Sequence, residues 1–178
     1  GMASGSRDAE GVPRRRQDLV ENGRLINMLW STRDAAQQVA EGRTTAAVST
    51  GSANSGGHQS PPTTGCTELF LTTSETTSSR DALLEKMGDG YVVNSVMGAH
   101  TANPTSGDFS VTTSAILKVE NGEIVGALKQ AGLSGNLAKS MNGAVMLGDD
   151  VRRQGSYSSG SMHLPDVLLM DGMRINPA

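Results

Sequence analysis

Apolar and polar residues alternate along much of this chain, and short turn signals separate the alternating runs. Two of the Asn-Gly pairs in the sequence, Asn22-Gly23 and Asn121-Gly122, each lie between two apolar runs that favour strands. This pair favours a type I′ turn, because both of its residues tolerate positive φ. The sequence therefore predicts two antiparallel hairpins, over residues 18–30 and 110–128.

Helices and further strands are expected between and around the hairpins. Segments that combine a Ser or Thr cap, a small apolar face and a following glycine are typical of short helices, and they cover residues 32–41, 78–87 and 134–141. Apolar runs that favour strands cover residues 66–73, 91–97, 144–147 and 167–175. Strands outnumber helices and the hairpins require antiparallel pairing. We therefore expect an α+β fold, with an antiparallel-rich curved sheet or partial barrel and about three short helices.

Three segments lack any periodic pattern. Residues 1–16 are polar and are predicted to form an N-terminal arm, followed by a single domain over 17–178, since a chain of 178 residues suits one domain. Residues 49–65 form a long loop of Gly, Ser, Pro and Thr with His58 inside it. Loops of this length are usually functional or disordered. Residues 155–162 are predicted to form a Ser-rich loop.

The segment from Gly98 to Val111 is the candidate functional site. It joins two strand-like runs and contains turn residues throughout, including Asn103-Pro104 and Ser106-Gly107-Asp108. An ordinary connecting loop explains this composition. The alternative is a loop that lines a cleft or a subunit interface. Its polar candidates are His100, Thr101, Asn103, Thr105 and Asp108.

Composition and charge narrow the classes of function. The formal net charge is -3 and aromatic residues make up 3% of the chain, which argues against a nucleic-acid-binding protein. No apolar run approaches the length that spans a membrane, and the first residues do not resemble a secretory signal. The single cysteine, Cys66, fits a reducing compartment, so we expect a cytoplasmic protein.

The sequence contains no clear motif for a zinc site or for a catalytic serine. The possible zinc ligands are His58, Cys66, His100 and His163, but none forms a closely spaced pair and no His-Glu-x-x-His or His-Glu-x-x-x-His helix occurs. No Gly-x-Ser-x-Gly elbow occurs either. A nucleophile supported by His100 and Asp108 is conceivable, but nothing in the sequence brings these residues together. We therefore expect no catalytic residue, no metal ligand and no cofactor in this chain.

A set of short motifs resembles the TldD/PmbA family, historically labelled modulators of DNA gyrase and now regarded as peptidases and their partner subunits. In family order, these motifs are DAEGVP (8–13), DLVENG (18–23), STGSA (49–53), TSGDFS (105–110), ENGEIV (120–125) and GDDV (148–151). The end of the chain resembles the PmbA/TldE branch, which lacks the cysteine of the zinc site. The likeness covers residues 8–175.

The resemblance implies a function, and one departure from the family pattern qualifies it. The His-Glu-x-x-x-His motif of the TldD branch is absent, because the chain begins after the place where that motif stands. We expect the C-terminal domain of a non-catalytic partner subunit in a peptidase system that processes peptides or unfolded segments. One alternative is a fragment of an active zinc metallopeptidase whose metal-binding helix lies outside this chain. Another is a self-associating structural β domain. The resemblance also implies a homodimer, or a heterodimer with a TldD-like subunit, and a peptide ligand.

Overall fold

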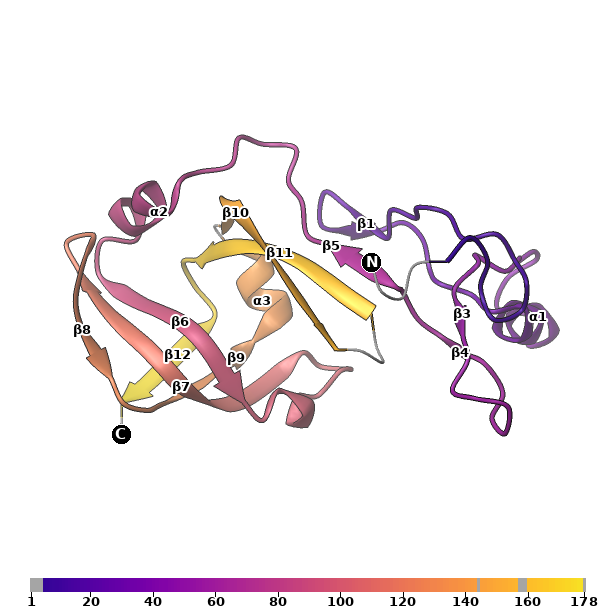
Figure 1. Ribbon diagram of the computed structural model, residues 1–178. Helices are drawn as coiled ribbons and strands as arrows, with labels where there is room; N and C mark the ends of the chain where they lie inside the picture. Colours follow the sequence, from indigo (N-terminus) through magenta and orange to yellow (C-terminus); the bar gives the residue numbers. More distant parts are fainter. Residues whose placement is uncertain (1–4, 144, 157–159, 178) are drawn as a thin grey trace. The chain divides into compact units, whose positions relative to one another are not determined.

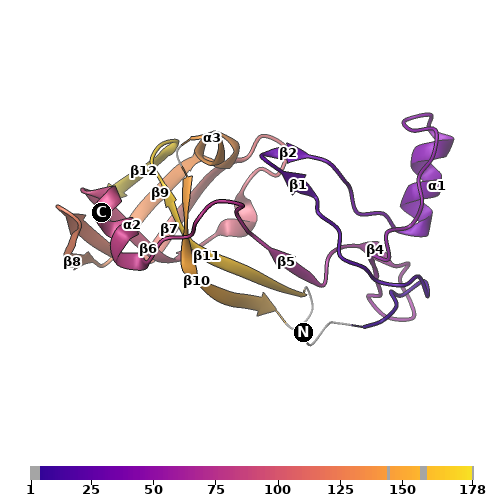
Figure 2. The same ribbon diagram turned by 90° about the horizontal axis from the view of Figure 1, so that it is seen from above.

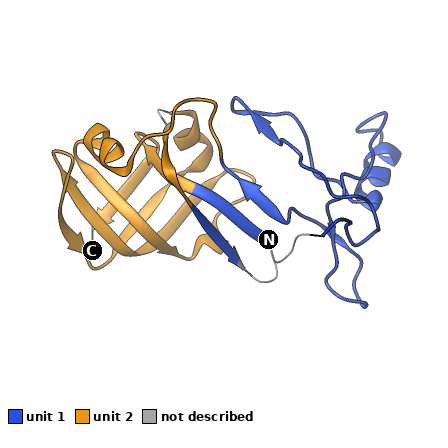
Figure 3. Cartoon of the chain, turned by 45° about the horizontal axis from the view of Figure 1, so that its top comes forward, with its two compact units in different colours: residues 1–71, 152–164 blue, residues 72–151, 165–178 orange. Residues whose placement is uncertain are grey.

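The computed structural model describes residues 5–143, 145–156 and 160–177, and the chain divides into two compact units (Figure 3). Unit 1 comprises residues 1–71 and 152–164, and unit 2 comprises residues 72–151 and 165–178. Strands β10 (Val145–Ser156) and β11 (Gly160–Leu169) contribute residues to both units.

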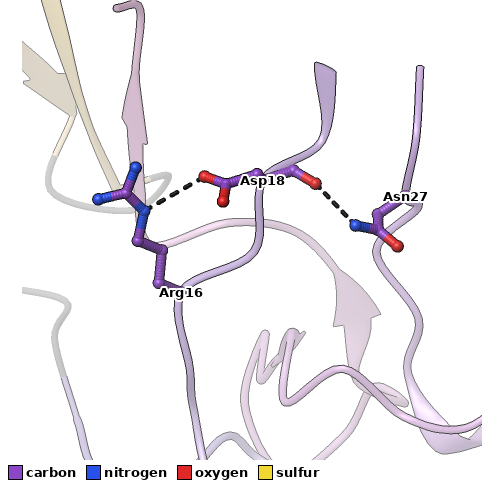
Figure 4. Close-up of polar contacts among 3 residues, drawn as sticks. All are labelled: Arg16, Asp18 and Asn27. Carbon is purple, nitrogen blue, oxygen red and sulfur yellow. Dashed lines mark hydrogen bonds and ion pairs between the residues drawn. The ribbon is translucent and has the colours of Figure 1, made fainter. Parts of the chain in front are cut away.

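Unit 1 begins with the predicted hairpin. Its strands are β1 (Val20–Glu21) and β2 (Arg24–Leu25), paired antiparallel. Asn22 and Gly23 have φ values of 50° and 73°, so the turn has the positive φ angles that the sequence predicts. At the base of the hairpin, Arg16 pairs with the Asp18 carboxylate at 3.2 Å (Figure 4). The Asn27 amide donates to the Asp18 carbonyl at 2.9 Å (Figure 4).

Helix α1 (Thr32–Ala40) confirms the first predicted helix. Ser31 precedes it, and its hydroxyl accepts a hydrogen bond from the Asp34 N–H at 3.0 Å, which is the expected capping contact. The small side chain of Ala35 is almost fully buried. Three short strands follow the helix: β3 (Ala53–Asn54), β4 (Thr63–Thr64) and β5 (Glu68–Phe70).

A buried carboxylate connects the start of the chain to the loop before β3. Asp8 is only 8% exposed. Its Oδ1 accepts hydrogen bonds from the N–H groups of Glu10 and Val12, both at 2.9 Å. Its Oδ2 accepts from the Ala53 N–H at 3.0 Å. Asp8 thus holds segments that lie far apart in the sequence.

Arg14 makes the second set of contacts with the same loop. Its guanidinium donates to the Ala53 carbonyl at 3.2 Å and to the Asn54 side-chain oxygen at 3.0 Å. Gly51 has a φ of 72°, and a Cβ on it would collide with the Pro13 carbonyl, so only glycine fits there. We call Asp8, Arg14 and residues 51–54 the Asp8 clamp.

Strands β5 and β11 of the described residues pair in parallel. They belong to a sheet with the order β10-β11-β5, in which His163 lies opposite Phe70. The two rings stack with centroids 4.2 Å apart. Strands β10 and β11 run side by side (Figures 1 and 2).

Unit 2 is built on one curved antiparallel sheet (Figure 1). Its strands follow the order β12-β9-β7-β6, and β8 also pairs with β7. The elements that unit 2 adds are α2 (Arg80–Met87), β6 (Gly90–Met97), the 3-10 turn η1 (Ala99–Thr101), β7 (Asp108–Glu120), β8 (Glu123–Leu128), β9 (Ala131–Asn136), α3 (Leu137–Asn142) and β12 (Met173–Pro177). The core side chains include Leu83, Val111, Ile116, Val119, Leu133, Leu147 and Leu168.

The fold class is confirmed, because the described residues contain three α-helices and mostly antiparallel sheets without a closed barrel. The second Asn-Gly hairpin is confirmed as β7–β8, with Asn121 at a φ of 51°. None of the helices in the described residues is long and apolar enough to cross a membrane. The division into an arm over 1–16 and a domain over 17–178 stays a prediction, and residues 1–4 lie outside the described residues.

Several predicted elements are wrong in their type or bounds. Residues 134–136 form the end of strand β9 rather than the start of the predicted helix, and the residue that caps α3 is Asn136. Helix α2 begins at Arg80, two residues after the start of the predicted range, and the Ser79 hydroxyl caps it. The predicted strand over 144–147 is longer, since β10 continues to Ser156, and Ala144 lies outside the described residues.

Two further boundaries differ near the end of the chain. Most of the predicted Ser-rich loop over 155–162 is strand, because β10 ends at Ser156 and β11 begins at Gly160. Residues 157–159 of that prediction lie outside the described residues. The single strand predicted over 167–175 is broken after Leu169, where Gly172 adopts a φ of 83° before β12 begins.

Candidate functional site

The candidate loop, Gly98–Val111, is ordered largely by its own hydrogen bonds. Gly98 has a left-handed φ of 87°, and its carbonyl accepts from the Thr101 hydroxyl at 2.8 Å. The Asn103 side-chain oxygen accepts from the N–H groups of Thr105 and Ser106, at 2.9 and 3.1 Å. This Asx-turn arrangement explains the predicted turn chemistry of the segment.

Asn136 ties the loop to the junction between β9 and α3. Its amide nitrogen donates to the Ser106 carbonyl at 2.8 Å and to the Asp108 carboxylate at 2.7 Å. Its side-chain oxygen accepts from the Lys139 N–H at 3.0 Å, which caps α3. One side chain thus fixes a helix start, a loop backbone and a carboxylate.

An open cleft of about 490 Å³ lies beside this junction in unit 2. Asp108 and Asn136 face it together with three further charged side chains, those of Lys139, Asp171 and Arg174. The strand register explains why several of these side chains lie close together, because Asp108 lies opposite Asn136 and Ser134 lies opposite Arg174. The cleft therefore presents both signs of charge next to the half-buried side chains of Ser134 and Asn136.

The cleft also affects the ionisation of Asp108. Hydrogen bonding from Asn136, and then from Ser106, lowers the pKa of the Asp108 carboxyl below its ordinary value of 3.8. The positive charge of Lys139 acts in the same direction, whereas partial burial opposes it. Asp108 is therefore a carboxylate that stays ionised at neutral pH.

Replacing Asn136 by alanine should raise the pKa of Asp108 relative to the wild-type protein, because the largest stabilising contact of the charged form is lost. A ¹³C NMR titration of the aspartate carboxyls measures this. Lys139→Ala is the matched control and should give a smaller rise, since Lys139 acts only through its charge. An unchanged Asp108 pKa in the Asn136→Ala variant would contradict the assigned contact.

Of the predicted site residues, only Asp108 lines the cleft. His100 and Thr101 lie in η1, Asn103 and Thr105 lie in the turn that follows, and all four are exposed. Asn103 and Thr101 serve the shape of the loop through the hydrogen bonds described above. A ligand or interface role for these five residues stays a prediction.

The other side chains of the cleft were not among the candidate residues predicted from the sequence. Asn136 and Lys139 belong to the helix predicted over 134–141, and Asp171 and Arg174 belong to the strand predicted over 167–175. A signal for Asn136 was present, because Asn directly before an apolar helical run is a favoured N-cap. No feature of the sequence around Arg174 indicated that this residue would line the same cleft.

The three histidines lie on separate elements. His58 lies in the exposed loop between β3 and β4, His100 lies in η1, and His163 lies on β11. The His163 Nε2 atom is buried without a hydrogen-bond partner and lies 4.0 Å from a Glu68 carboxylate oxygen. Within residues 5–143, 145–156 and 160–177, no group of three or more His, Cys, Asp or Glu side chains could hold a metal ion.

Comparisons with known proteins agree over nearly the whole chain. A family model described as the PmbA/TldA metallopeptidase C-terminal domain matches residues 1–176. The chain is 30% identical over 169 residues to the metalloprotease PmbA of Escherichia coli O157:H7, and 35% identical over 156 residues to an uncharacterized protein of Methanocaldococcus jannaschii. These matches cover 95% and 87% of the chain, but the chain spans only 33% of the length of each relative.

Solved structures show the same fold. A protein of Thermotoga maritima described as a candidate modulator of a DNA gyrase superposes with a TM-score of 0.73 at 30% identity, over 98% of this chain and 35% of its own. TldE from Thermococcus kodakarensis superposes with a TM-score of 0.79 at 23% identity, over 97% of this chain and 36% of its own. The second likeness concerns the fold alone.

Proposed function

Because the chain belongs to the PmbA/TldD family as a C-terminal domain of that family, we propose that it is part of a non-catalytic partner subunit in a peptidase system. The system would process peptides or unfolded segments of protein in the cytoplasm. The partner of this subunit would be a TldD-like subunit or a second copy of the same protein. The observation that carries the proposal is the match of the family model over residues 1–176.

The mixed-charge cleft supports a role in holding polypeptide rather than cleaving it. Asp108 and Asn136 are engaged with each other at 2.7 Å, so the carboxylate is held as a charged acceptor. Arg174 and Lys139 supply donors on the same rim. Such groups can bind the amides and charged side chains of an extended segment, and they lack an activated nucleophile.

The 178-residue chain by itself should cleave neither casein nor an unstructured peptide, with or without added zinc. A hydrolytic zinc site needs three protein ligands and a base, and the histidines lie on separate elements. A fluorescent casein assay measures cleavage, and elemental analysis after zinc addition measures bound metal. A TldD-like subunit tested alone and with this chain is the control, and the two should copurify. Chelator-sensitive cleavage by the chain alone, or one tightly held zinc per chain, would overturn the proposal.

The names of several relatives favour a second candidate function. These relatives are called metalloprotease PmbA or homologues of it, which would suit a piece of an active zinc metallopeptidase whose metal-binding helix lies outside these residues. The reading frame that encodes the preceding segment distinguishes the two functions. A His-Glu-x-x-x-His motif there would favour the active enzyme.

A further inference from the structure

The four charged side chains of the cleft differ in how far the chain itself engages them. The Asp108 carboxylate accepts hydrogen bonds from the Asn136 amide, at 2.7 Å, and from the Ser106 side chain. The Asp171 carboxylate accepts one from the Gly172 N–H at 2.6 Å. Groups of the chain therefore already occupy acceptor positions on both carboxylates of the cleft.

The two cations of the cleft are not engaged in this way. Arg174 makes no ion pair and no side-chain hydrogen bond within the part of the chain that the structure describes. The same holds for the ammonium group of Lys139, although its charge acts on Asp108. Both side chains are exposed. The cleft thus offers positive charge and hydrogen-bond donors that the described residues leave unused.

The strand register places Arg174 on the same face as other polar groups. Residues directly opposite each other in an antiparallel sheet share a face, and so do residues two apart along one strand. Arg174 lies opposite Ser134, and Asp108 lies opposite Asn136. Because Ser134 and Asn136 are two positions apart on β9, all four side chains are on one face of the unit 2 sheet. A ligand held by Arg174 would therefore also reach the Ser134 hydroxyl.

We propose that Arg174 binds a carboxylate group of the polypeptide that the cleft holds. A guanidinium group matches a carboxylate, because two parallel N–H groups donate to its two oxygens. Lys139 adds a second positive charge to the same cleft, and Ser134 adds a further donor. The carboxylate belongs either to the C-terminus of the polypeptide or to an Asp or Glu side chain. This inference rests on the proposed function and names the chemistry of the ligand.

Binding of synthetic peptides to the 178-residue chain tests the inference by fluorescence anisotropy. The probe is a short, labelled Gly/Ser peptide with two central glutamates and a free C-terminus. It should bind at least about tenfold more tightly than the same peptide with glutamines in place of the glutamates and an amidated C-terminus. Two further peptides, each with only one kind of carboxylate, show which kind supplies the affinity.

Substitutions in the cleft should change the affinity for the probe in opposite directions. Arg174→Gln should weaken binding at least about tenfold. Asp171→Asn should tighten it about twofold, because it removes a like charge and keeps an acceptor for the Gly172 N–H. Arg24→Gln is the matched control and should leave the affinity unchanged, since Arg24 is an exposed arginine on β2 in unit 1.

Three outcomes would overturn the inference: a probe that does not bind, equal affinity for the charged and uncharged peptides, or full affinity in the Arg174→Gln variant. Circular dichroism checks that the variants fold. If Arg174→Gln does not fold, NMR of the wild-type chain decides, because the side-chain Nε–H signal of Arg174 should shift with the probe but not with the uncharged peptide. An unmoved signal would refute the contact. Loss of this contact would leave copurification with a TldD-like subunit intact, so the two proposals fail separately.

Discussion

Replacing Asp8 by alanine should lower the free energy of unfolding by about 3 kcal/mol, since a buried group that loses its partner costs about 1–3 kcal/mol. Three backbone N–H groups, those of Glu10, Val12 and Ala53, lose their acceptor at once. Arg14 also loses the carboxylate that its charge complements. Urea unfolding followed by circular dichroism measures the change, and a difference within about 0.5 kcal/mol of the wild type would contradict the clamp.

The same residue should make stability depend on pH. Burial raises the pKa of the Asp8 carboxyl, but the hydrogen bonds from Ala53, Val12 and Glu10 and the charge of Arg14 outweigh it, so the pKa lies below 3.8. The folded state therefore prefers the charged form. The contribution of Asp8 to the free energy of unfolding is complete at a pH above the pKa that this carboxyl has in the unfolded chain. It disappears as the pH falls through the lower pKa of the folded state. Asp8→Asn is the control, because it keeps the shape and should remove this part of the acid dependence.

Replacing Gly172 by alanine should lower the free energy of unfolding by about 3 kcal/mol or more. Gly172 has a φ of 83°, where a residue with a side chain costs about 1–2 kcal/mol. The added Cβ would also lie 2.5 Å from the Ser140 hydroxyl and 2.9 Å from the Ser140 backbone nitrogen. Ser140 is fully buried and cannot move away without disturbing α3.

Gly98→Ala is the matched control for Gly172→Ala. Gly98 has almost the same φ, 87°, but nothing lies within 4 Å of the Cβ that would be added. This variant should therefore show only the backbone cost, about 1 kcal/mol. Thermal unfolding of the two variants separates the steric effect from the conformational one. Equal losses of stability would mean that the packing of Gly172 against Ser140 is unimportant.

The hairpins were predictable because their cause is local. Asn22-Gly23 and Asn121-Gly122 dictate positive φ within two residues, and no distant contact is needed to form the turn. The caps of α1 and the glycine after α2 are local in the same way, which is why their positions could be predicted within one residue.

Strand β9 was not predictable from its own residues. Ala131–Asn136 contains two glycines, which disfavour a strand when the segment is considered alone. The strand exists because it pairs with β7 on one side and β12 on the other. Gly135 is even required, because a Cβ there would collide with the Gly172 carbonyl. Tertiary pairing thus overrides local preference here.

The cleft and the Asp8 clamp could not be predicted from local sequence either. The turn chemistry around Asn103 and Asp108 identified a structured loop, but the cleft needed Asn136 and Arg174 from other strands. The Asp8 clamp joins residues 8 and 53, which periodicity cannot connect. From the sequence, only the resemblance of residues 8–13 and residues 49–53 to motifs of one family indicated that these two segments are part of the same domain.

The parallel pairing of β5 with β11 has a consequence for synthesis of the chain. Residues 66–71 emerge from the ribosome long before residues 160–164, which supply their only sheet neighbour in the described residues. Unit 1 therefore stays incomplete until the central part of unit 2 has been translated, because domains fold only when their residues are available. During that interval Leu69 and Phe70 lie on an unpaired apolar strand. In the finished protein β11 covers this segment along one edge.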